Sequence, residues 1–395
     1  MESRLTAPVD GGNRHEVLGV ARLFLRLGIT AFGGPAAHVV LMEREVVGRR
    51  GWLTRDAFLD LQALVQVLPG PNSTELAIHI GHARAGWRGA MVAGLGFVLP
   101  SVVLVWGLMA LAQSPALGAA TVGVLWWLAP VVAVIIAEAL WRFGTQAFAR
   151  PNAAVVLPLT AVAAVLVPSD LLVLAVGAMT AALIGIRSRG GGVLALWLAA
   201  PLVTAAAAGA QAVSAGVAPP GVAAVLLYFL RAGVSVFGSG YVLLAYLQRD
   251  LVDRLGWMTM DALVQASALA QITPGPLFST ATAAGYAIGG SPGAVAATVG
   301  VFAPAFASVL VGGPLRRLLE RSPVTPFALD GVVIASVSLL GRALVGFALP
   351  LSLWQWSIAA VAAVLLLRYR VAATLLLVTA VTIGAAGAVL PLLRS

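Results

Sequence analysis

Residues 24–71 contain the stretches Phe24-Leu25-Arg26-Leu27-Gly28, Phe32-Gly33-Gly34-Pro35, Gly51-Trp52-Leu53-Thr54 and Gln66-Val67-Leu68-Pro69-Gly70-Pro71. The same pattern returns 205 positions later, as Phe229-Leu230-Arg231-Ala232-Gly233, Phe237-Gly238-Ser239-Gly240, Gly256-Trp257-Met258-Thr259 and Gln271-Ile272-Thr273-Pro274-Gly275-Pro276. Without a gap, 20 of 48 positions are identical. The chain therefore carries an internal repeat, and both copies place helix-breaking Gly and Pro inside apolar segments.

The composition indicates a polytopic helical membrane protein. Hydrophobic residues make up 60% of the 395 residues and charged residues only 10%, and apolar runs of about 20 residues recur along the chain. The net charge of +9 comes from arginines in short loops, which set membrane orientation and do not indicate nucleic-acid binding. The absence of Cys excludes disulfides and thiolate chemistry. The polar first 16 residues lack the pattern of a cleavable signal peptide.

Thirteen apolar segments are predicted to be helical. They cover residues 17–42, 56–84, 89–112, 118–148, 151–167, 170–186, 193–214, 221–247, 261–288, 293–315, 326–348, 353–367 and 371–391. Six segments precede the connecting segment 193–214, and six follow it. We therefore divide the chain into an N-terminal transporter repeat (1–190), a connecting transmembrane segment (191–220) and a C-terminal repeat (221–395).

The loop arginines predict that the two repeats have opposite orientations in the membrane. After the Pro-Gly-Pro region of each half, arginines occupy alternate loops, and the loops that carry them in one half correspond to arginine-free loops in the other. By the positive-inside rule, equivalent loops then lie on opposite faces, as in the inverted repeats of secondary transporters. The arginine-rich loop 43–55 leaves two alternatives: segments 17–42 and 56–84 either cross the membrane or dip in and return.

The breaks predict a binding site for an anion. At bilayer depth, unpaired backbone groups cost several kcal/mol each, so broken helices usually line a cavity. The half-helix that begins after each break would point amide N–H groups and a positive dipole end into that cavity. The substrate-binding residues predicted at and after the breaks are Gly33, Gly34, Pro35, Ala36, His38, Pro69, Gly70, Pro71, Asn72, Ser73, Thr74, Glu75, Gly238, Gly240, Pro274, Gly275, Pro276 and Ser279.

Two further pairs of repeat-related residues complete the predicted site. Arg26 and Arg231 could neutralise an anion, the alternative being that they snorkel at helix ends. Gln66 and Gln271 could donate to the ligand or bridge freed carbonyls. Glu75, His79 and His82 share one helix face, which would suit a proton relay, anion gating or hydrogen-bonded packing; we predict no metal site.

The motifs at the breaks resemble those of the chromate ion transporter family in its long, two-domain form. The resemblance rests on Phe32-Gly33-Gly34-Pro35-Ala36-Ala37-His38, Gly51-Trp52-Leu53, Leu68-Pro69-Gly70-Pro71-Asn72-Ser73-Thr74-Glu75 and their second-half counterparts, and it covers essentially the whole chain. His82 and Ser239 depart from the family pattern. The resemblance implies an inner-membrane protein that exports chromate, a tetrahedral dianion shaped like sulfate, and confers resistance to it.

We therefore predict a secondary transporter that works by alternating access, without cofactor or catalytic residues. No Walker loop is present, which excludes ATP-driven pumping by this chain alone. The partners predicted are chromate or a similar oxyanion and the lipid bilayer of the plasma membrane, with a cytoplasmic N-terminus and no nucleic acid. Proton coupling and a homodimer stay open. The alternatives are a carrier for sulfate or another oxyanion, a pore, and a non-transporting scaffold.

Overall fold

The computed structural model describes residues 14–32, 34–68, 70–112, 118–150, 152–167, 169–189, 220–236, 240–321 and 324–389, and the regular structure of these residues is entirely helical. The predicted connecting segment 193–214 lies outside the described residues. Gly33, Pro69 and Gly238 also lie outside them.

The helices follow one another in the same order in both halves. The first half contains α1 (Arg14–Thr30), α2 (Gly34–Glu43), the π-helix η1 (Arg44–Arg49), α3 (Arg55–Val67), α4 (Asn72–Ala112), α5 (Gly118–Phe148), α6 (Ala153–Leu166) and α7 (Asp170–Arg189). The second contains α9 (Val222–Ser235), α10 (Gly240–Leu247), the π-helix η3 (Gln248–Arg254), α11 (Met260–Ile272), the 3₁₀-helix η4 (Leu277–Ser279), α12 (Thr280–Arg321), α13 (Thr325–Ala348), α14 (Leu353–Leu367) and α15 (Ala373–Val389).

The repeated residues produce repeated local structure. Thr54 and Thr259 begin α3 and α11, and each hydroxyl accepts a hydrogen bond of 3.2 Å from the backbone N–H three residues later. Gly51 and Gly256, which precede these caps, both have φ of +60°, a conformation that favours glycine. The predicted breaks are confirmed as interruptions between α1 and α2, α3 and α4, α9 and α10, and α11 and η4.

The long helices α4 and α12 each bend at an equivalent place. Ala85 and Gly86 leave the helical conformation in α4, and Gly289 and Gly290 do so in α12, with nearly equal backbone angles. The bends separate the predicted segments 56–84 from 89–112 and 261–288 from 293–315. The offset between halves is 204 here, because the second half is one residue shorter after its Pro-Gly-Pro break.

Helix length and composition make this a multi-pass membrane protein. In the described residues, four apolar helical stretches are long enough to cross a bilayer: Asn72–Ala112, Gly123–Phe148, Leu277–Leu310 and Thr325–Ala348. Shorter apolar helices of 10–17 residues accompany them. The lengths of α1 and α3, 17 and 13 residues, correspond to about 26 and 20 Å, so neither spans the roughly 30 Å of hydrocarbon alone if it lies straight across.

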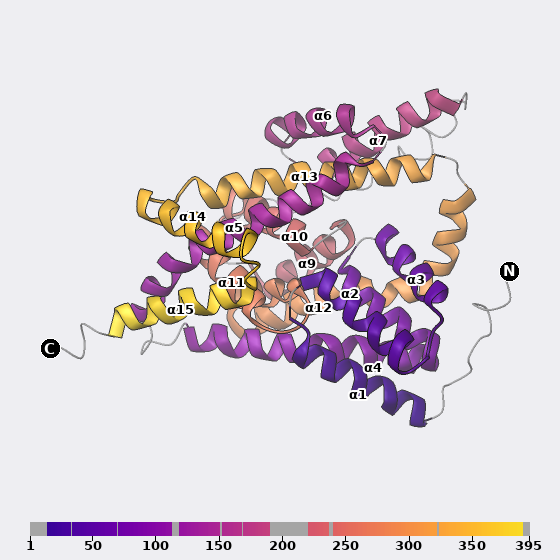
Figure 1. Ribbon diagram of the computed structural model, residues 1–395, viewed down its shortest axis with the longest axis horizontal. Coiled ribbons are helices and arrows are strands. Elements are labelled where there is room, and N and C mark those ends of the chain that lie inside the picture. The colour runs from indigo at the N-terminus through magenta and orange to yellow at the C-terminus, as the bar shows by residue number, and fades with distance from the viewer. Residues whose placement is uncertain are drawn as a thin grey trace.

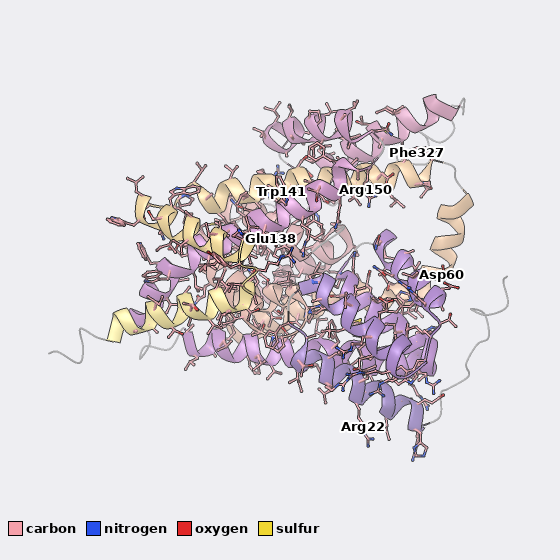
Figure 2. The ribbon with its side chains drawn as sticks, in the orientation of Figure 1. Arg22, Asp60, Glu138, Trp141, Arg150 and Phe327 are labelled. Carbon is pink, nitrogen blue, oxygen red and sulfur yellow. The ribbon has the colours of Figure 1, made fainter. Side chains whose placement is uncertain are left out.

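The two halves are packed into each other. Within the halves, α1 packs along α4 and α9 packs along α12. Between them, α6 and α7 of the first half pack on α13 of the second, and α14 and α15 of the second pack on α5 of the first (Figure 1). The ion pair between Arg150, which follows α5, and Asp330 of α13 adds a polar contact between the halves (Figure 2).

The close packing of α1 on α4 depends on a glycine facing a proline-containing turn. A Cβ at Gly28 would lie 2.5 Å from the Gly96 carbonyl oxygen and 2.9 Å from that of Phe97, next to Pro100. The equivalent Gly233 of α9 faces Val301 and Pro304 of α12 in the same way. Rigid backbone atoms cannot move aside easily, so a side chain at either position would push the two helices apart.

Replacing Gly28 with Ala is therefore expected to cost about 1–3 kcal/mol of stability through overpacking. The matched control is Gly107→Ala on α4, where an added Cβ meets no atom within 4 Å. That variant should be neutral or slightly stabilising, since Ala favours a helix over Gly. Thermal unfolding of both purified variants in detergent measures the difference, and equal unfolding temperatures would contradict the packing argument.

Candidate functional site

The breaks of the two halves are tied together by a reciprocal pair of backbone hydrogen bonds. The Gly70 N–H donates to the Val236 carbonyl at 2.8 Å, and the Gly275 N–H donates to the Ala31 carbonyl at 2.9 Å. Gly70 and Gly275 are repeat-related, as are Ala31 and Val236. Their φ angles of +137° and +101° require glycine. Each break thus satisfies a freed amide with a freed carbonyl of the other half, and the four predicted breaks meet in pairs.

Buried hydroxyl groups lie at the beginning of the half-helices that follow Pro-Gly-Pro. Thr74 and Ser279, each three residues after a Pro-Gly-Pro, are fully buried. Neither hydroxyl has a hydrogen-bond partner among the described residues. Ser73 is also buried. Donors of this kind, at the positive end of a helix, are suited to an anion or to water.

The other residues predicted around the breaks are placed differently from one another. Pro71, Gly240, Pro274 and Pro276 are buried, Gly34, Pro35 and Asn72 are half-buried, and the side chain of Ala36 is not described. His38 is buried, its Nε2 lies 3.2 Å from the Ala31 carbonyl, and its ring packs edge-on against Phe97. Gln66 is exposed, whereas the Gln271 amide donates to the Ser267 carbonyl at 3.1 Å, so the paired glutamines do not share one environment.

The helix face predicted to carry Glu75, His79 and His82 is buried at one end and exposed at the other. Glu75 and His79 are buried, and His82 is exposed. The His79 Nε2 lies 3.3 Å from the Ser308 hydroxyl of α12. The described residues contain no cluster of three side chains that could hold a metal ion.

Arg26 and Arg231, predicted as equivalent, are found in different settings. The Arg26 guanidinium forms an ion pair of 2.6 Å with Glu45 of η1, and about half of its side chain is exposed. Glu45 also pairs with Arg49 at 2.7 Å and lies 3.6 Å from Arg50. Arg26 therefore has a structural partner and is not directed at the breaks.

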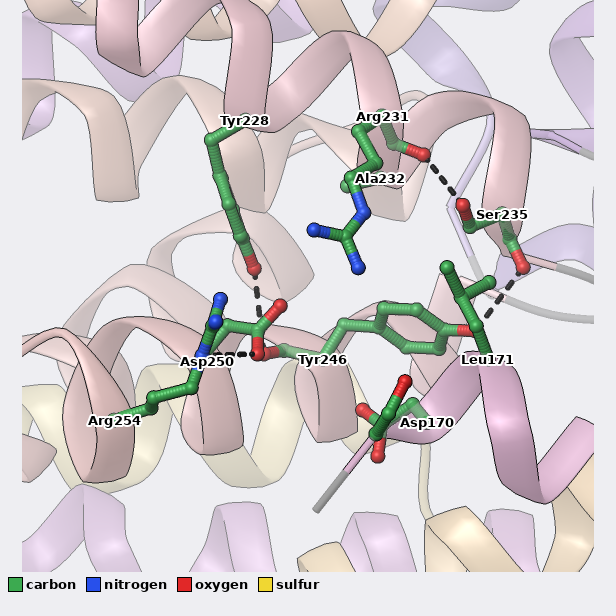
Figure 3. A pocket seen from close by; sticks show the side chains of 10 residues that line it. Asp170, Leu171, Tyr228, Arg231, Ala232, Ser235, Tyr246, Asp250 and Arg254 are labelled. Carbon is green, nitrogen blue, oxygen red and sulfur yellow. Dashed lines mark hydrogen bonds and ion pairs between the residues drawn. The ribbon is translucent and has the colours of Figure 1, made fainter. Parts of the chain in front are cut away.

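Arg231 instead lines a small polar cavity. Its volume is about 40 Å³, enough for roughly three waters. The lining residues are Ser169, Asp170, Leu171, Tyr228, Arg231, Ala232, Ser235, Tyr246, Asp250 and Arg254. The Arg231 guanidinium points between the tyrosine side chains, and in the part of the chain that the structure describes it has no ion pair (Figure 3).

The carboxylates around this cavity are engaged by other arginines. Asp170 of α7 pairs with Arg249 of η3 and, at 2.6 Å, with Arg342 of α13. Asp250 pairs with Arg254 at 3.2 Å. The exposed Asp253 lies near Arg249 and Arg342, so the four arginines and three aspartates leave an excess of one positive charge. Of these four arginines, Arg231 is the one with no ion pair among the described residues.

A second repeated element, not predicted from the sequence, is an acidic residue on each π-helix. Glu45 and Asp250 differ by the same 205 positions, as do the arginines that pair with them one turn later, Arg49 and Arg254. The constant offset was the signal that could have revealed these pairs. In the first half, Arg26 contacts Glu45. At the equivalent place in the second half, Asp250 is one methylene shorter than Glu, and the cavity opens between it and Arg231.

The two carboxyl groups titrate differently. Burial acts to raise the pKa of Glu45, but hydrogen bonds and charges from Arg26 and Arg49 outweigh it and lower this pKa below the ordinary value. For Asp250, burial prevails and the pKa is raised, although Arg254 and Arg231 favour the charged form.

Glu45 should make stability depend on pH. Its pKa is lower in the folded state, so its ion pairs stabilise the fold above the ordinary glutamate pKa, and this contribution is lost as pH falls through the folded pKa. Glu45→Gln should lower the unfolding temperature at neutral pH and flatten its fall in acid. Thermal unfolding between about pH 7 and about pH 3 tests this.

Glu43→Gln provides the control, because Glu43 forms only a long, exposed pair with Arg55 at 3.7 Å. A difference between wild type and Glu45→Gln that stays constant with pH would contradict the assignment.

Comparison with known proteins identifies the family to which this chain, with its repeated breaks, belongs. The family model described as "Chromate transporter" matches residues 18–186 and again residues 223–388, one match for each half. The chain belongs to the chromate transporter family.

Several family members from bacteria are similar over most of their length. The chain is 37% identical to the chromate transport protein of Pseudomonas aeruginosa over 82% of this chain and 79% of that protein. It is 30% identical to the chromate transport protein of Cupriavidus metallidurans over 82% and 80%, respectively. An uncharacterized transporter of Bacillus subtilis is 34% identical over 31% of this chain and 69% of its own length. No solved structure matches the chain significantly.

Proposed function

We propose that this protein transports chromate, or a closely related tetrahedral oxyanion, across the plasma membrane by alternating access. Relatives named chromate transport proteins support the substrate class. The observation that carries the mechanism is the reciprocal pair of hydrogen bonds from Gly70 to Val236 and from Gly275 to Ala31. These bonds join the two halves at their breaks, where a rocking motion of one half against the other would alter the site.

Opposite orientation of the halves is part of this proposal. The alternating loop arginines support it, because the positive-inside rule places equivalent loops on opposite faces. The repeat-related contacts, in which α6 and α7 pack on α13 while α14 and α15 pack on α5, are those expected of two halves related by a pseudo-twofold axis. With that axis in the membrane plane, one site between the halves would open to either side in turn.

The anion would use groups from both the breaks and the Arg231 cavity. The end of α9 connects the cavity to the breaks. Arg231 and Ser235 line the cavity, and the carbonyl of Val236, the next residue, accepts the hydrogen bond from the Gly70 N–H. A dianion entering a low-dielectric region needs positive charge and donors to replace water. Arg231 supplies a guanidinium that has no ion pair among the described residues, and Thr74 and Ser279 supply buried hydroxyls.

Export is the direction favoured by the membrane potential. Moving one elementary charge through 100 mV is worth about 2.3 kcal/mol, so a dianion gains roughly 4.6 kcal/mol on leaving a negative interior. This energy alone sustains a concentration ratio above about a thousandfold at 100 mV. An exporter in the inner membrane would therefore need little further driving force to confer resistance.

Chromate flux in proteoliposomes tests the proposal. Wild-type protein should give saturable flux above that of empty liposomes, driven by an imposed potential, and Arg231→Ala should lower it by about tenfold or more, since the anion loses its unpaired cation. Arg26→Ala is the matched variant: it should reduce stability more than flux, because Arg26 is paired with Glu45.

Flux equal to that of empty liposomes would overturn chromate transport, and non-saturable flux would indicate a pore. If sulfate inhibits chromate flux at the same concentration as chromate itself, the protein would be a general oxyanion carrier. Equal loss of flux in both arginine variants, with stability unchanged, would restore the equivalence predicted from the sequence.

A further inference from the structure

Glu75 is a buried carboxyl group that the anion site does not account for. It lies one turn into α4, and none of its surface is exposed. Neither carboxyl oxygen has a hydrogen-bond partner among the described residues. The carboxyl packs against the Pro-Gly-Pro break, since a Cβ at Gly70 would lie 2.8 Å from Glu75 Oε1. An acidic side chain thus touches the residue that joins the two halves.

Among the described residues, the groups identified near Glu75 do not stabilise a negative charge. The Gly70 N–H is already used by the Val236 carbonyl, and the Gly233 carbonyl oxygen of α9, an acceptor, lies 3.6 Å from where a Cβ at Gly70 would be. On α4 itself, His79 is directed at Ser308 of α12. From the other elements at the breaks, His38 of α2 is engaged with the Ala31 carbonyl, and Arg231 of α9 lines the cavity.

The magnitudes favour a neutral carboxylic acid. Removing a carboxylate from water without a partner is costly even after the protein relaxes. The positive end of α4 would offset only part of that cost. The cost exceeds the gain, so the group retains its proton. The offset of 205 makes Thr280 equivalent to Glu75, and the offset of 204 that holds farther along makes Ser279 equivalent; neither residue is acidic, so only the first half has a carboxyl group at this position.

We infer that Glu75 is a proton-binding site linked to the anion site, and that it holds a proton while the anion is bound. This inference rests on the proposed function. In the protonated state Glu75 is uncharged and offers an O–H donor at the break. When the O–H bond breaks, the proton passes to water and a carboxylate remains, which repels a dianion. Proton and anion thus favour each other's binding, by the same factor in both directions.

This linkage predicts how pH acts on transport. Acid on the side from which chromate is loaded should raise the apparent affinity for chromate, and alkali on that side should lower it. One proton would accompany one dianion, which leaves a net charge of −1, so the membrane potential would still favour export.

The experiment compares wild type, Glu75→Gln and Glu138→Gln in proteoliposomes. Gln has nearly the shape of protonated Glu but cannot release a proton, so Glu75→Gln should exchange chromate without dependence on pH and should not respond to an imposed pH gradient. Glu138 is half-buried on α5 and is the matched control, which should keep the wild-type response (Figure 2). Infrared spectra provide a readout independent of transport: the C=O stretch of a protonated carboxylic acid at neutral pH should be present in wild type and absent in Glu75→Gln.

The outcomes separate this inference from the proposed function. A wild-type protein that moves no chromate but shows the infrared band, lost in Glu75→Gln, would refute chromate transport and support the proton site. A wild-type protein that moves chromate, with Glu75→Gln retaining the same pH response, would refute the proton linkage alone. Absence of the infrared band from the wild type, or a band of undiminished intensity in Glu75→Gln, would show that Glu75 is ionised and overturn the inference directly.

Discussion

The structure depends on the need to satisfy backbone groups that broken helices leave unpaired inside an apolar protein. Each uncompensated group would cost several kcal/mol in a membrane. The chain meets this cost by directing the Gly70 amide to Val236 and the Gly275 amide to Ala31, so that the break in one half is completed by the other half. Because neither half can satisfy its breaks alone, the duplicated sequence forms one packed unit.

The same constraint positions the functional groups. A break that is closed by backbone contacts leaves the start of the next half-helix inside the protein, and in both halves a hydroxyl side chain, Thr74 or Ser279, is buried there. Tight packing of α1 on α4 and of α9 on α12, which requires Gly28 and Gly233, holds these helix starts in place. Val236, which accepts the hydrogen bond from the Gly70 N–H, directly follows the end of α9, where Arg231 and Ser235 line the adjacent cavity.

Two copies of one backbone nevertheless carry different side chains. Glu45 reaches Arg26, whereas the shorter Asp250 leaves Arg231 without an ion pair in the described part of the chain. A carboxylic acid occupies position 75 and a threonine occupies position 280. In the mechanism that we propose, a symmetric backbone would suit a site that opens to either side in turn, and the unequal side chains would give the anion one preferred cation and one proton-binding group. The repeat therefore supplies the architecture, and the differences within it supply the chemistry.

The sequence by itself determined the helical membrane class, the repeat, the position of every break and most helix limits, because apolar periodicity and Gly or Pro act locally. It also predicted the family, which the comparison confirmed. Only the tertiary structure separated Arg26 from Arg231, left Gln66 exposed and Gln271 partly buried, and left Glu75 without a hydrogen-bond partner among the described residues. Those outcomes depend on which side chain of another helix lies within a few ångströms, and neither composition nor spacing along one chain encodes that distance.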